Sequence, residues 1–183
     1  MTEAPGGVDV DEVKSLIAEQ NLRDMLNVAG QTPAGAFIEV GVYQGGSAYL
    51  LSLVAQDQRR QLHLFDTFEG MPESSEVDKH QVGDFSDTSL EQVKAIIPDA
   101  FFHVGMFPYT LPVNLGRIAF AHIDCDQYES IRAACLLLPS RMVTGGVMYF
   151  DDYGCLEGAT KAVDEFMPQR IVLQNGKAMV IIP

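Results

Sequence analysis

The sequence predicts an α/β fold of the doubly wound type, with a mostly parallel seven-stranded sheet and a C-terminal antiparallel hairpin. Short apolar runs alternate with stretches of helical periodicity, the order that covers both faces of a parallel sheet with helices. The chain ends in two apolar runs around Asn175-Gly176, a strong hairpin signal. A length of 183 residues, 47% of them hydrophobic, suits one domain over residues 1–183.

The individual elements are expected in a regular order. Residues 1–35 are expected to form a helical N-terminal segment, because an apolar stripe at Val10, Val13, Ile17, Leu22 and Leu26 is closed by Gly30 and Pro33. The expected strands are 36–40, 61–65, 101–104, 118–123 and 146–150. The expected helices are 46–55, 89–97, 128–138 and 158–166. The polar stretch 67–87 is a candidate lid, since loops of that length in compact domains often close over ligands.

Composition excludes several classes of partner. A net charge of -13 and a pI near 4.5 oppose binding to nucleic acid or anionic lipid. No apolar stretch approaches the roughly 20 residues of a membrane span, and the N-terminus lacks the features of a secretory signal. We therefore expect a cytoplasmic protein without nucleic-acid or membrane partners. The spacing of Cys125, Cys135 and Cys155 favours neither a disulfide framework nor a zinc cluster.

A glycine-rich turn joins the first expected strand to the following helix. The turn runs from Gly41 to Ser47, and its glycines would let a ligand approach the backbone closely, while Ser47 can cap the helix or bind that ligand. Asp66 ends the second strand, where doubly wound folds hold a ribose hydroxyl. The combination predicts an adenosine-containing cofactor, and the alternative is an ordinary strand-to-helix turn.

The residues around the turn favour one such cofactor. The glycines at 41, 45 and 46 do not have the spacing of a dinucleotide fingerprint, and no P-loop lysine follows. Glu39 would repel a pyrophosphate but can hold the cationic amino group of S-adenosylmethionine. The sequence therefore favours S-adenosylmethionine, and a dinucleotide-dependent oxidoreductase is a weaker alternative.

Four acids follow two other apolar strands. Asp124 and Asp126 come after the strand 118–123, and Asp151 and Asp152 after the strand 146–150. If these strands are parallel neighbours, about 4.8 Å apart, their terminal carboxylates can share a cation. Oxygen ligands select Mg²⁺, Ca²⁺ or Mn²⁺ over zinc.

Each of these acids also has a simpler interpretation. Asp126 is free to act as a base but can equally cap the helix that begins near Tyr128. Asp152 can belong to an Asp-Asp-Tyr-Gly turn, and the four acids together can form an inert solvated edge. Their position after apolar strands, on the ligand side of a doubly wound sheet, favours a functional site.

With these residues assembled, the chain resembles the macrocin O-methyltransferase family, whose members methylate sugar hydroxyls of macrolide and aminocoumarin antibiotics. The resemblance is carried by residues 39–47, 65–72, 83–85, 122–130 and 145–153, and the second and fourth segments are the most specific. It implies the class I methyltransferase sheet and S-adenosylmethionine held by Glu39, Gly41, Ser47 and Asp66. It also implies Asp124, Asp151 and Asp152 as magnesium ligands and Asp126 as general base. Around the cofactor we further expect Tyr43, Gly45, Thr67 and Gly105.

The expected function is thus divalent-metal-assisted O-methylation of a small-molecule acceptor, a sugar hydroxyl or glycoside. The family has a longer N-terminal region than the segment that precedes Ala36 here, so a homodimer that helps to enclose the acceptor is one expectation. A catechol-like phenol is a second candidate acceptor. It is disfavoured because Gln127 stands where catechol methyltransferases place a lysine base. A non-catalytic partner subunit that binds S-adenosylmethionine is a third possibility.

Overall fold

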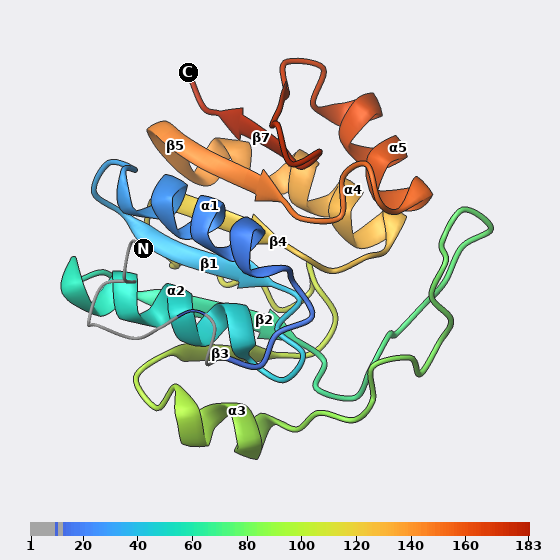
Figure 1. Cartoon of the computed structure of the whole chain (residues 1–183), viewed down its shortest axis with the longest axis horizontal. Helices are drawn as coiled ribbons and strands as arrows, with labels where there is room; N and C mark the ends of the chain where they lie inside the picture. Colours follow the sequence, from blue (N-terminus) through green and yellow to red (C-terminus); the bar gives the residue numbers. More distant parts are fainter. Residues whose placement is uncertain (1–9, 11–12) are drawn as a thin grey trace.

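The computed structural model describes Val10 and residues 13–183, and its centre is a seven-stranded sheet of order β3-β2-β1-β4-β5-β7-β6 (Figure 1). The strands are β1 (Ala36–Val40), β2 (Leu62–Asp66), β3 (Phe101–Val104), β4 (Ile118–Ile123), β5 (Met142–Phe150), β6 (Ile171–Val172) and β7 (Ala178–Ile181). The helices are α1 (Glu19–Gly30), α2 (Gly46–Asp57), α3 (Leu90–Ile96), α4 (Tyr128–Leu137) and α5 (Glu157–Phe166). The first five strands are parallel, and β7 joins β5 antiparallel.

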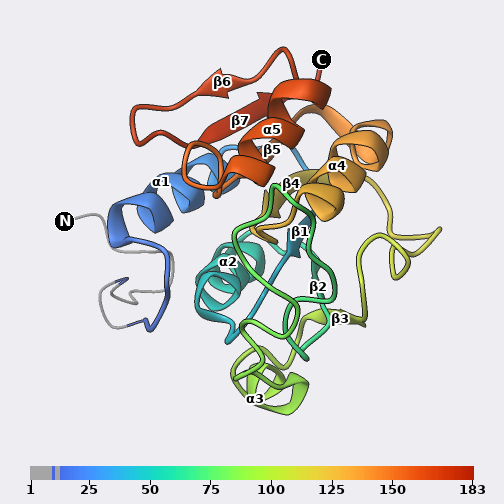
Figure 2. The ribbon, with the colours of Figure 1, turned by 90° about the vertical axis from the view of Figure 1, so that its right-hand side faces the viewer.

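Two hydrophobic cores lie on opposite faces of the sheet. The helices α1 and α2 cover one face and α4 and α5 cover the other, as the edge-on view shows (Figure 2). Successive residues of β1 alternate between these cores, with Phe37 in one and Ile38 in the other, and every residue of β1 is buried. A strand that is buried on both faces explains why the sequence is a continuous apolar run here and not an alternating one.

The order in which strands are added to the sheet reverses between β1 and β4. From β1 the chain runs outward through β2 and β3, then returns to place β4 and β5 on the other side. Val40, Ile123 and Phe150 are aligned in register, so the loops after β1, β4 and β5 start at the same edge. Backbone hydrogen bonds join these loops, from Asp124 to Val40 at 2.9 Å and from Asp151 to Ile123 at 3.2 Å. Doubly wound folds bind their ligands at such a switch point.

The fold class is confirmed, but the N-terminal helix is shorter than predicted. The helix begins at Glu19, and the predictions for residues 1–9, 11 and 12 lie outside the described residues. Val13 and Ile17 still pack against the core, yet they are not helical. The amide of Ile17 donates a hydrogen bond to the Ser15 hydroxyl at 3.1 Å, and such local side-chain bonds compete with helix formation.

Two further differences concern the end of the sheet. Strand β5 begins at Met142, four residues before the predicted start, because Met142 already pairs with Ile118 of β4; the register then shifts across Gly145 and Gly146 before Val147 pairs with Phe120. The amide of Gly145 donates to the carbonyl of Ile182, and the amide of Ile182 donates to the carbonyl of Gly146, so the residue after β7 binds both glycines. The predicted hairpin is present with a β6 of only two residues. In the described part of the chain, no helix is both long and apolar enough to cross a membrane.

Candidate active site

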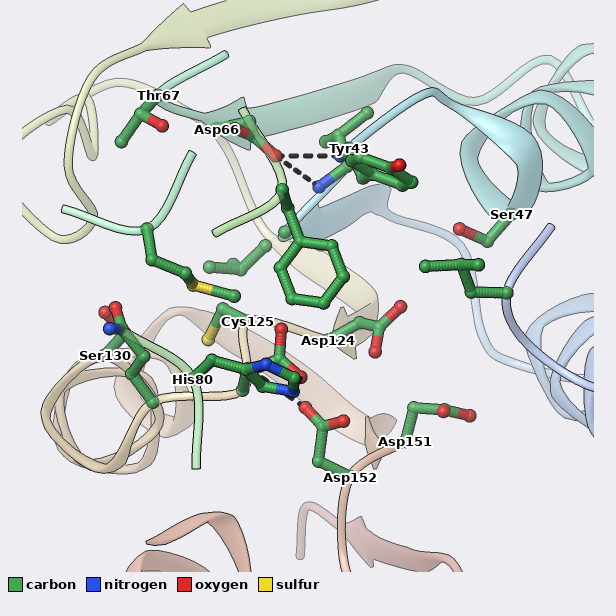
Figure 3. A pocket seen from close by; sticks show the side chains of 18 of the residues that line it. Tyr43, Ser47, Asp66, Thr67, His80, Asp124, Cys125, Ser130, Asp151 and Asp152 are labelled. Atoms are coloured by element: carbon green, nitrogen blue, oxygen red, sulfur yellow. Dashed lines mark hydrogen bonds and ion pairs between the residues drawn. The ribbon is translucent and has the colours of Figure 1, made fainter. Parts of the chain in front are cut away.

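A cavity of about 430 Å³ opens at the carboxyl edge of the parallel strands. Its walls are the loops that follow β1 to β5, together with residues 14–17 and Lys177. Figure 3 shows Asp66 and Tyr43 at one end of the cavity and Asp151 and Asp152 at the other, with Asp124 between them. Asp66 and the four acids that follow β4 and β5 therefore share one cavity.

Asp66 is held in place by the backbone. One carboxylate oxygen accepts hydrogen bonds from the amides of Val42 at 2.7 Å and Tyr43 at 2.9 Å, both in the glycine-rich turn (Figure 3). The other oxygen accepts from the amide of Phe68 at 2.7 Å. A carboxylate offers about four lone-pair positions, so this one still has acceptor capacity for a ligand hydroxyl. Asp66 is thus a preorganised acceptor in the cavity wall.

Gly41 has a structural role in addition to the ligand contact that the sequence suggested. It has a φ of +88°, and a Cβ atom there would lie 1.9 Å from the carbonyl oxygen of Asp124. The close backbone approach that we predicted for a ligand is therefore made first by the chain itself. Gly41 also lines the cavity, so a contact with the cofactor stays a prediction.

Glu39 is fully buried behind the cavity wall and is not among the residues that line it. One of its oxygens accepts hydrogen bonds from the Ser47 hydroxyl at 2.7 Å and from His122 Nδ1 at 2.8 Å. Its other oxygen and His122 Nε2 are buried without a partner. Burial lowers the pKa of His122, but the hydrogen bond and charge of Glu39, helped by Asp151 and Asp152, outweigh it, so the net pKa is raised. Ser47, which does line the cavity, presents this buried network to a ligand.

The remaining predicted cofactor residues divide into two groups. Tyr43, Thr67 and Gly105 line the cavity. Gly45 does not line the cavity. It is the N-cap of α2 with a left-handed backbone, and a Cβ atom there would lie 3.0 Å from a side-chain carbon of Val93. The capping role offered for Ser47 is thus filled by Gly45.

Asp124, Asp151 and Asp152 form a compact cluster. Each offers one oxygen, and these atoms all lie within 4.8 Å of one another. Two of the three residues are buried and one is half-buried. Three converging carboxylates are a donor set typical of Mg²⁺, Ca²⁺ or Mn²⁺, so the residues fit a hard divalent cation.

Asp126 stands beside this cluster without belonging to it. It has a left-handed backbone, with φ of +61°, and its amide donates to Asp152 Oδ2 at 3.0 Å. The N-cap of α4 is Gln127, whose side chain makes no capping hydrogen bond, and the first amide of the helix, that of Tyr128, donates to Asp78 Oδ1, so the capping role considered for Asp126 is not observed. Asp152 does belong to a turn, because its carbonyl accepts hydrogen bonds from the amides of Cys155 and Leu156 at 3.0 Å, while its carboxylate accepts from the Asp126 amide.

Crowding and burial change the protonation of these acids. Burial, reinforced by the charges of Asp152, Asp151 and Asp126, raises the pKa of Asp124 well above its usual value. Burial is also the main cause that raises the pKa of Asp152 to about 8 and that of Asp126 to about 6. A cation between the carboxylates would offset this penalty, which is a second reason why the cluster fits a metal ion.

The structure adds two residues beside the cluster. Lys177 is buried and donates to Asp151 Oδ2 at 3.1 Å, although 26 residues separate the two. His80, in the loop between β2 and α3, places Nε2 3.9 Å from Asp126 Oδ1. The register of β7 against β5 would have located Lys177, but no local pattern gives that register.

The loop 67–87 covers one side of the cavity. It contributes Thr67, Gly70, Met71, Pro72, His80 and Phe85 to the lining. The loop is fastened to the body of the protein where Asp78 Oδ1 accepts a hydrogen bond from the Tyr128 amide at 2.8 Å. Its position fits the lid that the sequence predicted, and closure over a ligand stays a prediction.

The strand order, the antiparallel β7 beside β5 and the cavity at the switch point define the class of protein: a class I methyltransferase fold. The chain belongs to the macrocin-O-methyltransferase (TylF) family, whose sequence model matches residues 17–177. This confirms the family that the sequence motifs resemble.

Two curated relatives come from Streptomyces. One, from Streptomyces olivaceus, is 34% identical over 72% of this chain and 58% of its own length, and is named 8-demethyl-8-(2,3-dimethoxy-alpha-L-rhamnosyl)-tetracenomycin-C 4'-O-methyltransferase. The other is the demethyldecarbamoylnovobiocin O-methyltransferase of Streptomyces niveus, 28% identical over 80% of this chain and 64% of its own length. The chain therefore spans less than two thirds of the length of either relative.

Solved structures share the fold. The O-methyltransferase NovP superposes with a TM-score of 0.78 at 21% identity, covering 91% of this chain and 81% of that one. A calicheamicin methyltransferase superposes with a TM-score of 0.74 at 20% identity, covering 88% of this chain and 77% of that one. At this level of identity, the similarity defines the fold alone.

Proposed function

We propose that the protein is an S-adenosylmethionine-dependent O-methyltransferase that uses a divalent cation, with Mg²⁺ the first candidate, to methylate a sugar hydroxyl of a small glycosylated molecule. One observation carries this proposal. The cluster of Asp124, Asp151 and Asp152, with Asp126 beside it, shares a single cavity with Asp66 and the glycine-rich turn. The proposed cofactor site and the proposed hydroxyl-activating site would thus face the same space.

The cofactor half has acceptors where S-adenosylmethionine, the methyl donor, needs them. Asp66 offers carboxylate oxygens to ribose hydroxyls, as acids at this position of doubly wound folds do. Ser47, backed by the buried Glu39, offers a hydroxyl in a region of negative potential, which suits a cationic amino group. Tyr43, Thr67, Gly41 and Gly105 complete the proposed wall.

The carboxylate half supplies the chemistry at the acceptor. Asp124, Asp151 and Asp152 would hold the divalent cation, which lowers the pKa of a coordinated hydroxyl and orients it. Asp126 is the proposed general base and accepts the hydroxyl proton on its carboxylate. Its pKa of about 6, raised mainly by burial, leaves it largely ionised at neutral pH and more basic than an ordinary aspartate. Closure of the loop 67–87, whose side chains line the cavity, would exclude water from this half.

A sugar hydroxyl is the acceptor that best suits this arrangement. Alcohol hydroxyls are much less acidic than phenols, so they benefit from both a cation and a base. One relative is named as a methyltransferase of a rhamnosyl group, which supports the same class of acceptor. Gln127, buried at the start of α4, cannot act as the base that a catechol-type mechanism would place there.

A methyl-transfer assay over a panel of glycosides and catechols, with Mg²⁺ or with chelator, tests the proposal. We expect transfer to a glycoside that stops in chelator and returns when Mg²⁺ is added. Transfer confined to catechols would overturn the acceptor class, and equal rates in chelator would overturn the role of the metal. Calorimetric binding of S-adenosylmethionine without transfer to any acceptor would indicate a non-catalytic binding subunit.

A further inference from the structure

Lys177 is a cation buried within an acidic site. Its residue exposure is 6%, that of Asp151 is 7%, and Nζ lies 3.1 Å from Asp151 Oδ2. Nζ also lies 3.7 Å from Cys155 Sγ. Burying an ammonium is costly unless it is paired, so its position next to one member of the carboxylate cluster needs a functional explanation.

The backbone fixes this position. Ala178 of β7 is paired with Phe150 of β5 in an antiparallel ladder, so the preceding residue, Lys177, faces the following residue, Asp151. The turn before β7 is also fixed, because Lys177 donates its amide to Asn175 Oδ1 at 3.0 Å and accepts from the Leu173 amide at 2.8 Å. Opposite charges that face each other across two strands stabilise the pairing.

The charges of the cluster can be added. The three carboxylates of the cluster carry -3 when they are ionised, and the ammonium of Lys177 offsets one of these charges at Asp151. We propose that Lys177 is a positioning residue that holds Asp151 in the cluster and that its positive charge favours a divalent cation over a trivalent one. The inference rests on the proposed metal-assisted function and extends it to the selection of the ion.

The proposal predicts a change in ion selectivity. If the charge of Lys177 is removed, the affinity for a trivalent ion rises more than the affinity for a divalent ion, because the ammonium no longer repels its extra unit of charge. At a separation of several ångströms and an effective dielectric constant of about 40, one such charge pair is equivalent to about a tenfold change in relative affinity. Misplacement of Asp151 would weaken both ions similarly, so the ratio of the two affinities isolates the charge.

The experiment compares the affinities of Mn²⁺, by electron paramagnetic resonance, and Tb³⁺, by luminescence, at one fixed pH. The variants are Lys177→Gln, Lys177→Met and the charge-retaining Lys177→Arg. Lys161→Met removes a positive charge from the exposed face of α5 and is the matched control. We expect the preference for Tb³⁺ over Mn²⁺ to rise about tenfold in the Gln and Met variants, and to stay within about twofold in the other two.

Each other outcome has a definite meaning. Lys177→Gln keeps an amide donor for Asp151, so it can serve as the test variant if Lys177→Met does not fold. Circular dichroism shows whether each variant is folded. An unchanged ratio in a folded Lys177→Gln protein would overturn the inference. Loss of turnover with unchanged ion affinities, not rescued by arginine, would instead identify Lys177 as a base that acts on the acceptor and would also overturn it. A wild-type protein that binds neither ion would refute the metal role itself, which is a separate failure.

Discussion

The two halves of the cavity satisfy their acidic groups in opposite ways. At the cofactor end, Asp66 accepts three backbone hydrogen bonds, and Glu39 accepts from Ser47 and His122. At the other end, three carboxylates face one another, and the pKa values of Asp124 and Asp152 are raised mainly by burial. In the first half the protein supplies partners for most of the acidic oxygens, although one oxygen of Glu39 stays unpaired, whereas the second half is balanced only when a cation or protons are added.

This contrast separates two tasks. The cofactor half is preorganised, so binding there costs little rearrangement. The carboxylate half stores an electrostatic penalty that a divalent cation would relieve, so binding of the ion and stability of the protein are linked. Changes in one half should therefore affect one ligand and leave the other nearly unchanged, which the following predictions use.

The largest effect is expected from Asp126→Asn. An asparagine cannot accept the hydroxyl proton, so kcat should fall by about 10²- to 10⁴-fold, while the affinities for S-adenosylmethionine and Mn²⁺ stay within a few fold. In the wild-type protein, the rate should fall as the pH drops through about 6, since protonation disables the base. Steady-state kinetics and calorimetry measure these quantities. Asp99→Asn, on an exposed turn, is the control, and a fully active Asp126→Asn protein would refute the assignment.

Asp152→Asn should weaken metal binding and leave the binding of S-adenosylmethionine nearly unchanged. Asparagine keeps a carbonyl oxygen for the Asp126 amide but removes one charge from the cluster. We expect Mn²⁺ affinity to fall by about 10- to 100-fold, with turnover falling in parallel at low metal concentration. Calorimetric titration with Mn²⁺ and with S-adenosylmethionine would check both. Equal losses for the two ligands would mean that the halves are not independent.

Asp66→Ala tests the cofactor half. The substitution removes a carboxylate that three amides hold in place, and hydrogen bonds to charged groups contribute about 1.5–3 kcal/mol, so S-adenosylmethionine affinity should fall by about 10- to 100-fold. Metal affinity should change little. Asp66→Asn retains one oxygen and should lose less. Unchanged cofactor affinity in the alanine variant would remove Asp66 from the site.

The smallest effect concerns stability in the absence of metal. Asp152 has a folded-state pKa of about 8, above its unfolded value, so the folded state binds more protons than the unfolded state between these two values. Stability of the metal-free protein should therefore decline as the pH rises from about 6 to 8. Added Mg²⁺ should raise the melting temperature more at pH 8 than at pH 6. Thermal unfolding at both pH values is the measurement, and a larger gain at pH 6 would contradict the linkage.

The sequence was sufficient for features that depend on local patterns. The strand-turn-helix around Gly41, the strand end at Asp66 and the acids after β4 and β5 could all be located, because buried parallel strands are continuous apolar runs that end at the ligand edge. The parallel alignment of β4 and β5 then brought Asp124 and Asp151 together as predicted.

Features that depend on long-range contacts could not be predicted. Lys177 reaches Asp151 only through the antiparallel register of β7, and Glu39 turns toward His122 of the adjacent strand β4. The start of helix α1 could not be predicted either. The Ser15 hydroxyl binds the Ile17 amide, so the helix does not include these residues although the apolar stripe continues through Ile17. The first two features depend on contacts between side chains that are distant in the sequence, and the third on a local bond between a side chain and the backbone that overrode the periodic pattern.

The contact between Gly41 and Asp124 has a mechanical consequence. The amide of Asp124 donates a hydrogen bond to Val40 at the end of β1. The carbonyl of Asp124 fills the space where any other residue at position 41 would place its Cβ atom. The glycine-rich turn and the loop that carries Asp124 are therefore joined by main-chain contacts. In the proposed site these contacts would set the separation between methyl donor and acceptor without the help of side-chain rotamers, and a methyl group added at position 41 would lengthen it.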